Sequence, residues 1–151
     1  LSTLHTNNAP ATISRLMEMR VPEYLIASTL SSVCAQRLVR NLCPSCAEPY
    51  APSAALLANL PGAVSASDAL YRRPKGCNAC RGTGYRGRAS IAEIMMVSDP
   101  IRELVLARAP ERDIRRKAMD EGMTPLLADG LRRAAAGLTS LDDVFRVAGL
   151  E

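Results

Sequence analysis

The spacing of apolar residues predicts a chain that is mainly helical, with one buried strand. In residues 22–42 the apolar side chains cover a wide helical face after Pro22, so we expect one long, largely buried helix there. Those apolar positions are Leu25, Ile26, Leu30, Val33 and Leu38. Cys34 falls on the same face, where a cysteine most often serves as a small buried hydrophobe.

The first ten residues, LSTLHTNNAP, predict the end of a strand followed by a polar loop. Asn8 is a good cap for a helix, and Pro10 fits the first turn, where its missing N–H removes no hydrogen bond. Ile13, Leu16 and Met17 then follow at helical spacing. A first helix is therefore expected directly after this loop.

The second half of the chain predicts a strand at residues 90–97 followed by four helices. The helices are expected to begin at Asp99-Pro100, Pro110, Thr124-Pro125 and Thr139-Ser140, with Gly122 and Gly137 ending two of them. Proline at the start and glycine at the end is the usual asymmetry of helices. In the last helix, Asp142 or Asp143 is placed to complete a capping box.

Composition limits the class of protein. With 151 residues the chain has the length of one domain with a small inserted lobe, and one Phe and no Trp leave an aliphatic core. No apolar run approaches the length of about 20 residues that crosses a bilayer. The start carries no Met and no signal-peptide pattern, so we expect a piece of a longer protein. A net charge of +4 does not by itself require a nucleic-acid partner.

Four of the five cysteines form two Cys-x-x-Cys pairs, which are the strongest chemical signal in the sequence. Cys43 and Cys46 make the first pair, Cys77 and Cys80 the second, and 30 residues separate them. Two such turns brought together supply the four thiolates of a structural Zn²⁺ site. That shell leaves no open position on the metal, so catalytic zinc is not expected. The segment between the pairs, with a short helix around residues 54–60, is interpreted as an inserted loop.

Three other interpretations of these cysteines are weaker. A redox dithiol needs one exposed pair of low pKa, whereas this chain has two pairs. The stretch CNACRGTG is similar to the zinc repeat of J-domain co-chaperones, but the repeat occurs once instead of four times. A basic zinc module for nucleic acid stays open on charge grounds, although the lobe has few aromatic residues on which bases would stack.

Three segments together resemble the C-terminal part of the type II/type IV secretion ATPases. They are STLHTNNAPATISRLMEM, YLIASTLSSVCAQRLVRNLCPSC and GCNACRGTGYRGRASIAEIM, in that order, and the tail EGMTPLLADGLRRAAAGLTSLDDVFRV is also similar. The resemblance implies an α/β fragment, mainly α, that ends a RecA-like P-loop ATPase domain and carries a tetracysteine zinc lobe and a C-terminal helical bundle. Its expected divisions are 1–42 for the ATPase core, 43–90 for the zinc lobe and 91–151 for a strand with the helical subdomain.

The resemblance also implies a function. Members are hexameric ATPases, cytoplasmic and peripheral at the inner membrane, that act on inner-membrane platform proteins to assemble a pseudopilus or a pilus. Powering type II protein secretion is the expected function, and type IV pilus assembly is the alternative, with no nucleic acid expected as a partner. His5 maps onto the family's histidine box, near the γ-phosphate of ATP, and the four cysteines map onto its zinc ligands. Arg37, Arg40, Arg86 and Arg88 receive no assigned role.

The sequence departs from the family at the nucleotide site. The chain has no G-x-x-x-x-G-K-[ST] loop to hold the phosphates and no acidic Walker B strand for Mg²⁺. Both precede the histidine box in the family. We therefore expect ATP and Mg²⁺ to be bound only by the full-length protein, and this chain alone to be inactive.

Overall fold

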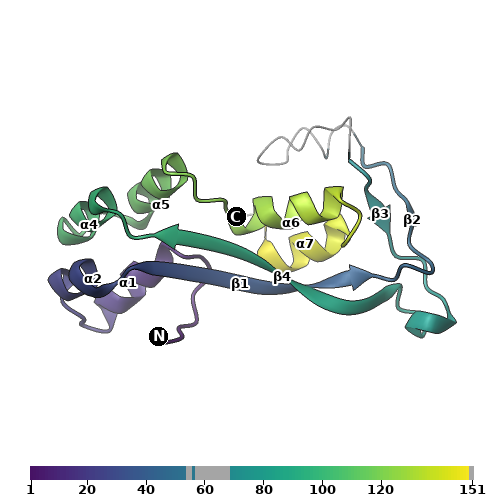
Figure 1. The fold of residues 1–151 in the computed structure, drawn as a ribbon, viewed down its shortest axis with the longest axis horizontal. Coiled ribbons are helices and arrows are strands. Elements are labelled where there is room, and N and C mark those ends of the chain that lie inside the picture. The colour runs from purple at the N-terminus through teal and green to yellow at the C-terminus, as the bar shows by residue number, and fades with distance from the viewer. Residues whose placement is uncertain (54–55, 57–68, 150–151) are drawn as a thin grey trace. The chain divides into compact units, whose positions relative to one another are not determined.

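The protein is a mixed α/β chain that forms two compact units. A computed structural model describes residues 1–53, 56 and 69–149, and within them it contains six α-helices and four strands (Figure 1). The first unit combines Leu1–Gln36 with Ala92–Pro125, and the second combines Arg37–Ile91 with Leu126–Glu151. Each unit thus takes residues from both sides of the cysteine pairs. None of the helices in the described part is both long enough and apolar enough to span a membrane.

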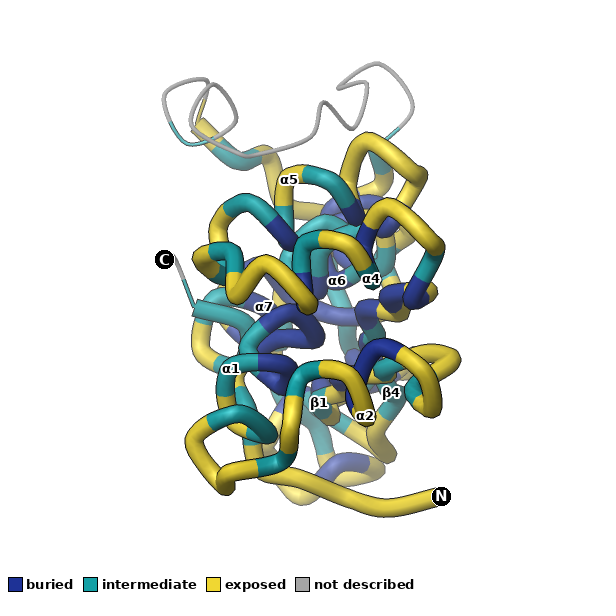
Figure 2. Tube along the Cα trace, turned by 90° about the vertical axis from the view of Figure 1, so that its left-hand side faces the viewer, coloured by how far each residue is buried: buried dark blue, intermediate teal, exposed yellow. Residues whose placement is uncertain are grey.

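The first unit is built from four short helices: α1 (Ala11–Glu18), α2 (Glu23–Thr29), α4 (Asp99–Leu106) and α5 (Glu111–Asp120). One side of each of α2 and α4 is buried and the other exposed (Figure 2). Two predicted helix starts are confirmed. The Asn8 side chain accepts the Ala11 N–H at 2.7 Å, and Ser98 caps the helix that carries Pro100. The core includes Ile13, Ile26, Met95, Ile101 and Ile114, so it is aliphatic as expected.

The second unit contains β2 (Glu48–Pro49), β3 (Arg72–Arg73), the 3₁₀ turn η1 (Asn78–Cys80), α6 (Leu126–Ala135) and α7 (Leu141–Ala148). Gly130 lets α6 and α7 pack closely, because a Cβ there would lie 2.6 Å from a methyl group of Val144. Gly137, with φ at +72°, follows α6 as predicted. The core of this unit comprises Val39, Tyr71, Ile91, Leu126, Leu131, Ala134, Ala135, Leu141 and Val144.

Two long strands, β1 (Ser32–Leu42) and β4 (Tyr85–Met96), pair with each other and run in opposite directions (Figure 1). β4 confirms the strand predicted at residues 90–97 and begins five residues earlier. β1 is a correction, because a helix was expected through residue 42. The helix ends at Thr29, and from Ala35 to Val39 the burial alternates between the two faces of a strand, with Gln36 and Leu38 exposed.

The error at β1 has a physical reason. Strand pairing with β4 satisfies the backbone of residues 32–42 over a long distance in sequence, and this outweighs local helical preference. Leu38 lies on the exposed face and Arg37 on the inward one, so the polar pattern hides the alternation. Cys34, expected to be buried, is exposed for the same reason.

Two other predictions concern the ends of elements. Residues 1–6 have no strand, although the end of one was expected there. In the described part of the chain no strand pairs with residues 1–6, so these residues stay irregular. The short helix predicted around residues 54–60 lies, apart from Leu56, outside the described residues.

A buried carboxylate holds the two strands against the last helix in the second unit. Asp143 has a fully buried side chain and accepts from the backbone N–H of Arg40 at 2.6 Å and from its Nε at 2.7 Å. Arg146 donates to the same carboxylate at 2.8 Å. The guanidinium of Arg40 also lies 3.9 Å from the ring centroid of Tyr85, whose hydroxyl is 2.7 Å from Ser140 Oγ. The Arg40 side chain of β1 therefore contacts both Asp143 of α7 and Tyr85 of β4.

The expected capping box is half formed. Ser140 Oγ accepts the Asp143 N–H at 3.2 Å, as a helix cap should. The carboxylate of Asp143 turns to Arg40 and Arg146 rather than completing the box. Burial raises the pKa of Asp143, but the hydrogen bonds from Arg40 and Arg146 outweigh this and hold the pKa below its usual value.

Replacing Asp143→Asn is expected to lower the free energy of unfolding by about 2 kcal/mol, because a charged acceptor of three donors is lost. The wild-type contribution is complete above the unfolded aspartate pKa of about 3.9 and is lost as pH falls through that value towards the lower folded pKa. Urea unfolding at several pH values measures both effects. The control is Asp142→Asn, an exposed neighbour on the same helix, which should change stability by less than about 0.5 kcal/mol. Equal effects of the two variants would contradict this role.

Candidate metal centre

The two cysteine pairs lie on two tight turns of the same unit. Cys43 and Cys46 follow the end of β1, and the Cys43 carbonyl accepts the N–H groups of Cys46 and Ala47 at 3.2 and 2.9 Å. Cys77 and Cys80 flank η1, and the Cys77 carbonyl accepts from Cys80 and Gly82 at 3.2 and 2.9 Å. In each turn the N–H of the second cysteine donates to the carbonyl of the first, and the sulfurs of both turns meet in one cluster.

Backbone pairing brings the two turns together. The Cys43 N–H donates to the Gly84 carbonyl at 2.9 Å, so the first turn is bonded to the residue that follows the second. β2 and β3 pair antiparallel, with Glu48 opposite Arg73, and these side chains form an ion pair at 2.7 Å. The Arg73 hydrogen bond is the main reason that the pKa of Glu48 is lowered.

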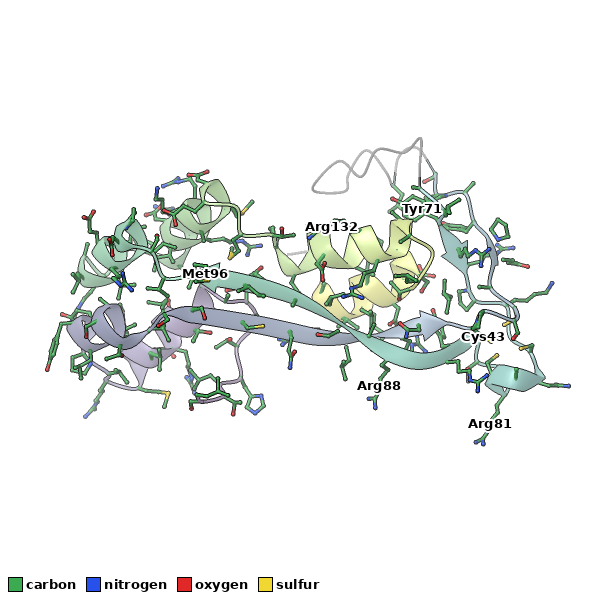
Figure 3. The ribbon with its side chains drawn as sticks, viewed as in Figure 1. Cys43, Tyr71, Arg81, Arg88, Met96 and Arg132 are labelled. Carbon is green, nitrogen blue, oxygen red and sulfur yellow. The ribbon has the colours of Figure 1, made fainter. Side chains whose placement is uncertain are left out.

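The four sulfurs have the spacing of a tetrahedral thiolate site (Figure 3). Cys43 and Cys77 are 3.9 Å apart between Sγ atoms, Cys46 and Cys80 3.8 Å, and Cys77 and Cys80 3.7 Å. A zinc ion with Zn–S bonds of about 2.3 Å requires edges of about 3.8 Å. A disulfide would need a separation of about 2.05 Å. The arrangement therefore fits Zn²⁺ held by four cysteines and does not fit disulfide bonds.

Backbone donors prepare one sulfur to be a thiolate. Cys80 Sγ accepts from the N–H of Cys77 at 3.2 Å and from that of Gly84 at 3.1 Å. Burial raises the pKa of Cys80, but these donors outweigh it and lower the pKa to about 6. Burial raises the pKa of Cys46 to about 11. Thiols this close do not all ionise together, so a cation is needed to hold all four as thiolates.

Two glycines shape the second turn. Gly76 has φ at +102°, and a Cβ there would lie 2.6 Å from the Gly82 carbonyl oxygen. Gly84 has φ at +74°, and a Cβ there would run into Pro74. Only glycine adopts these angles in so little space. Gly84 also supplies the N–H to Cys80, which couples the tight backbone to the sulfur.

The cluster can stabilise structure but offers little for catalysis. Four protein ligands fill a tetrahedral zinc, so no position remains for water or substrate. Bound Zn²⁺ would supply a cross-link between the two turns, and with it part of the folding free energy of the lobe. Cys34, the fifth cysteine, is exposed on β1 and belongs to the first unit.

The histidine segment lies in the first unit. His5 is exposed, in the irregular stretch before α1. Immediately after it, Asn8 and Ala9 are buried, and the side chain of Asn8 donates to Glu111 at 2.9 Å. Glu93 on β4 is only 1% exposed, and its Oε1 accepts the Ala9 N–H at 2.8 Å. The backbone behind His5 is thus fixed by a residue 84 positions away in sequence.

Several of these roles were missed by sequence reasoning. Arg40 received no role, and the structure places it on Asp143 and over the ring of Tyr85. Asp143 was considered only for a capping box and Glu93 was given no role, because neither contact has a local sequence signal apart from a carboxylate in an apolar stretch. Arg86 and Arg88 are both exposed on β4, and Arg88 projects away from the ribbon (Figure 3).

Comparison with known proteins supports the resemblance noted in the sequence. The family model described as type II/IV secretion system protein matches residues 1–146. The type II secretion system protein E of Pseudomonas aeruginosa is 40% identical over 147 residues, covering 97% of this chain and 29% of the relative. The type II secretion system ATPase E of Vibrio cholerae is 40% identical over 148 residues, with the same coverage of 97% and 29%. The type IV pilus assembly ATPase PilB of Myxococcus xanthus is 39% identical over 147 residues, covering 95% of this chain and 26% of the relative. The chain therefore spans less than a third of the length of these curated relatives.

The zinc assignment predicts about one zinc ion per chain in elemental analysis of protein prepared without chelators. Changing Cys43→Ser or Cys77→Ser should reduce the zinc content to near zero, because three thiolates hold the ion far less tightly. Cys34→Ser is the matched control and should retain the metal. A zinc content that is unaffected by Cys77→Ser would rule out the four-cysteine site.

The glycine geometry gives a second expectation. Gly84→Ala places a methyl group against Pro74 at a positive φ, whereas Gly82→Ala meets nothing within 4 Å and bears only the strain of φ at +79°. We expect Gly84→Ala to lower the free energy of unfolding of the zinc-loaded chain by about 2 kcal/mol more than Gly82→Ala. Chemical denaturation and competition with a chelator measure stability and zinc affinity. If both variants lose stability equally, the contact with Pro74 is not what demands glycine.

Proposed function

Because the chain belongs to the type II/IV secretion system protein family, we propose that it is the C-terminal portion of a hexameric ATPase that powers type II protein secretion. In this proposal the full-length protein is cytoplasmic and peripheral at the inner membrane. It drives pseudopilus assembly through inner-membrane platform proteins. The observation that carries the proposal is the match over residues 1–146, joined by a relative named as a type II secretion system ATPase at 40% identity.

Type IV pilus assembly is the second candidate. Two relatives named as pilus assembly ATPases are 39% identical to the chain, which is nearly the same identity as for the secretion proteins. Both functions use ATP to move a platform, so the chemistry proposed for this chain is the same in either case. The two candidates differ in the partner that receives the motion.

Nucleotide chemistry in this proposal is divided between this chain and residues that it does not contain. Residues 1–42 end the RecA-like core, 43–90 form the zinc lobe, and 91–151 add a strand and a helical subdomain. ATP and Mg²⁺ bind to a phosphate loop and an acidic strand that precede the histidine segment in the full-length protein. His5 then faces the γ-phosphate, and the contact from Glu93 to Ala9 holds the backbone that presents it.

The exposed position of His5 is consistent with such a role. A side chain that contacts a phosphate has to be exposed so that it can reach the nucleotide, while its backbone stays fixed. His5 is exposed and Ala9 is fully buried, and only three residues separate them. The zinc site has a different part in the proposal: it holds the lobe in shape and takes no part in hydrolysis.

The proposal predicts no ATP hydrolysis above background by the 151-residue chain, and clear hydrolysis by the full-length protein. In the full-length protein, His5→Ala should lower kcat about a hundredfold with little change in KM, since a group that contacts the γ-phosphate acts mainly on the transition state. Arg15→Ala, an exposed change on α1, is the control and should leave kcat unchanged. Hydrolysis by the short chain at the rate of the full-length protein would refute the division of the site.

A further inference from the structure

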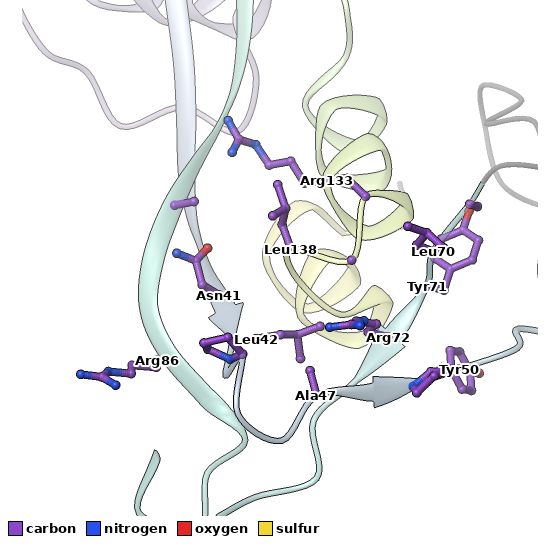
Figure 4. A pocket seen from close by; sticks show the side chains of 16 residues that line it. Asn41, Leu42, Ala47, Tyr50, Leu70, Tyr71, Arg72, Arg86, Arg133 and Leu138 are labelled. Carbon is purple, nitrogen blue, oxygen red and sulfur yellow. The ribbon is translucent and has the colours of Figure 1, made fainter. Parts of the chain in front are cut away.

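The second unit has a groove that neither the zinc site nor the histidine segment explains. It encloses about 830 Å³ beside β3 and the end of α6, and all its described lining residues belong to this unit (Figure 4). The described lining includes Arg72, Arg86 and Arg133 and contains no Asp or Glu. A hollow of this size with cationic walls is suited to a ligand larger than a single ion.

Large apolar side chains lie exposed beside these arginines. Tyr50, Leu70 and Leu138 all line the groove, and they are 36, 71 and 53% exposed. Isolated exposed leucines are ordinary on a protein surface, but three large side chains around one hollow form a surface that association would cover.

The arginines of the groove are not engaged in strong ion pairs. Within the described residues, Arg72 and Arg86 make no salt bridge, and the stem of Arg72 lies against Gly137, where a Cβ would be 3.3 Å from Cδ. Arg133 Nε is buried without a hydrogen-bond partner in the part of the chain that is described. Its nearest carboxylate, Asp129, is 3.7 Å away and also neighbours Arg132 at 3.5 Å, so two arginines share one acid.

The charge of the whole chain is concentrated in the unit that carries the groove. By sequence, the second unit has eleven Lys and Arg against six Asp and Glu, a net charge of +5. The first unit has eight against nine, a net charge of −1, and the two add to the +4 of the chain. An acidic partner is therefore attracted to the second unit and not to the first.

The arrangement of the arginines selects among acidic partners. Figure 4 shows Arg72 and Arg133 at separate places among the lining residues and the Arg86 side chain directed away from them, so the three arginines do not converge on one phosphate. A nucleic acid would need exposed rings on which to stack, but Tyr71 is only 6% exposed and Tyr50 alone remains. Separated cations with apolar side chains between them match an extended chain that alternates carboxylates and apolar residues.

We propose that this groove is a docking site for a partner protein's peptide segment that combines acidic and large apolar side chains. Its carboxylates pair with Arg72 and Arg133, and its apolar residues cover Leu70, Leu138 and Tyr50. The site goes beyond the ATP-driven function proposed above, because it lies in the described chain and needs no nucleotide.

The test uses the zinc-loaded 151-residue chain and a fluorescein-labelled peptide in which glutamate and leucine alternate. Fluorescence anisotropy should show saturable binding that weakens as salt is raised. Arg72→Glu should weaken binding at least about tenfold, because an attraction becomes a repulsion. Leu70→Ser should weaken it about threefold or more through lost apolar cover, with little effect on folding because the side chain is exposed.

Arg88→Glu is the matched control, since Arg88 is exposed on the same lobe, carries the same charge and does not line the groove. It should change the Kd by less than about twofold. Peptides with lysine in place of glutamate, or serine in place of leucine, should bind poorly. Equal losses for Arg72→Glu and Arg88→Glu would overturn the proposal in favour of non-specific attraction. Tighter binding of an oligonucleotide or of anionic vesicles than of the peptide would overturn it as well.

ATPase measurements keep this proposal separate from the previous one. Peptide binding by the 151-residue chain is measured without any nucleotide, so its result does not depend on ATPase activity. If the full-length protein hydrolyses ATP and the peptide does not bind, the docking site alone is wrong. If the peptide binds with the expected dependence on Arg72 and Leu70 and no ATPase activity is found, the family function is wrong and the docking site stands.

Discussion

The close approach of four sulfurs is the interaction on which the second unit depends. All four lie within 4.8 Å of one another, and three of their separations, 3.7 to 3.9 Å, match the edges of a zinc–thiolate tetrahedron; such distances are unfavourable for four ionised thiols without a cation. The two turns that carry them lie at the end of β1 and just before β4, so the same cluster lies where β1 ends and β4 begins. A metal bound by these sulfurs would add a cross-link to the hydrophobic core of the unit and so contribute to its folding free energy.

A second cross-link made of ordinary side chains supports the same strands. Asp143 on α7 binds the backbone and the guanidinium of Arg40 on β1, and Arg40 in turn covers the ring of Tyr85 on β4. Tyr85 follows Gly84, whose N–H donates to Cys80. The cysteine cluster and the Asp143–Arg40 contact therefore meet at neighbouring residues, Gly84 and Tyr85. Loss of either is expected to disturb the other through the first residues of β4.

The sequence predicted those parts of the structure that depend on local chemistry. The helix starts after Asn8, at Asp99-Pro100 and at Thr139-Ser140 followed from capping side chains and a proline in the first turn, and the clustering of the four cysteines followed from their spacing. The strand β1 was missed because its pairing with β4 is a long-range interaction, and Leu38 on its exposed face disguises the alternation. The contact of Glu93 with Ala9 was beyond prediction for the same reason, since it joins residues 84 positions apart.

The two units differ in net charge and in the kind of residue that each holds in place. The first unit has nearly balanced charge and fixes the backbone behind an exposed histidine through a buried carboxylate, which is the arrangement needed where one side chain must be placed accurately. The second unit has a net charge of +5, carries four cysteines that could hold a metal, and has at its groove Arg72 without a salt bridge among the described residues and Arg133 near a shared Asp129. Keeping like charges together costs stability, and a cross-linked lobe tolerates that cost better than a small aliphatic core does. On this argument the cysteine cluster and the groove belong together: a metal bound by the four cysteines would make the unit rigid enough to hold the groove arginines in place for an acidic partner.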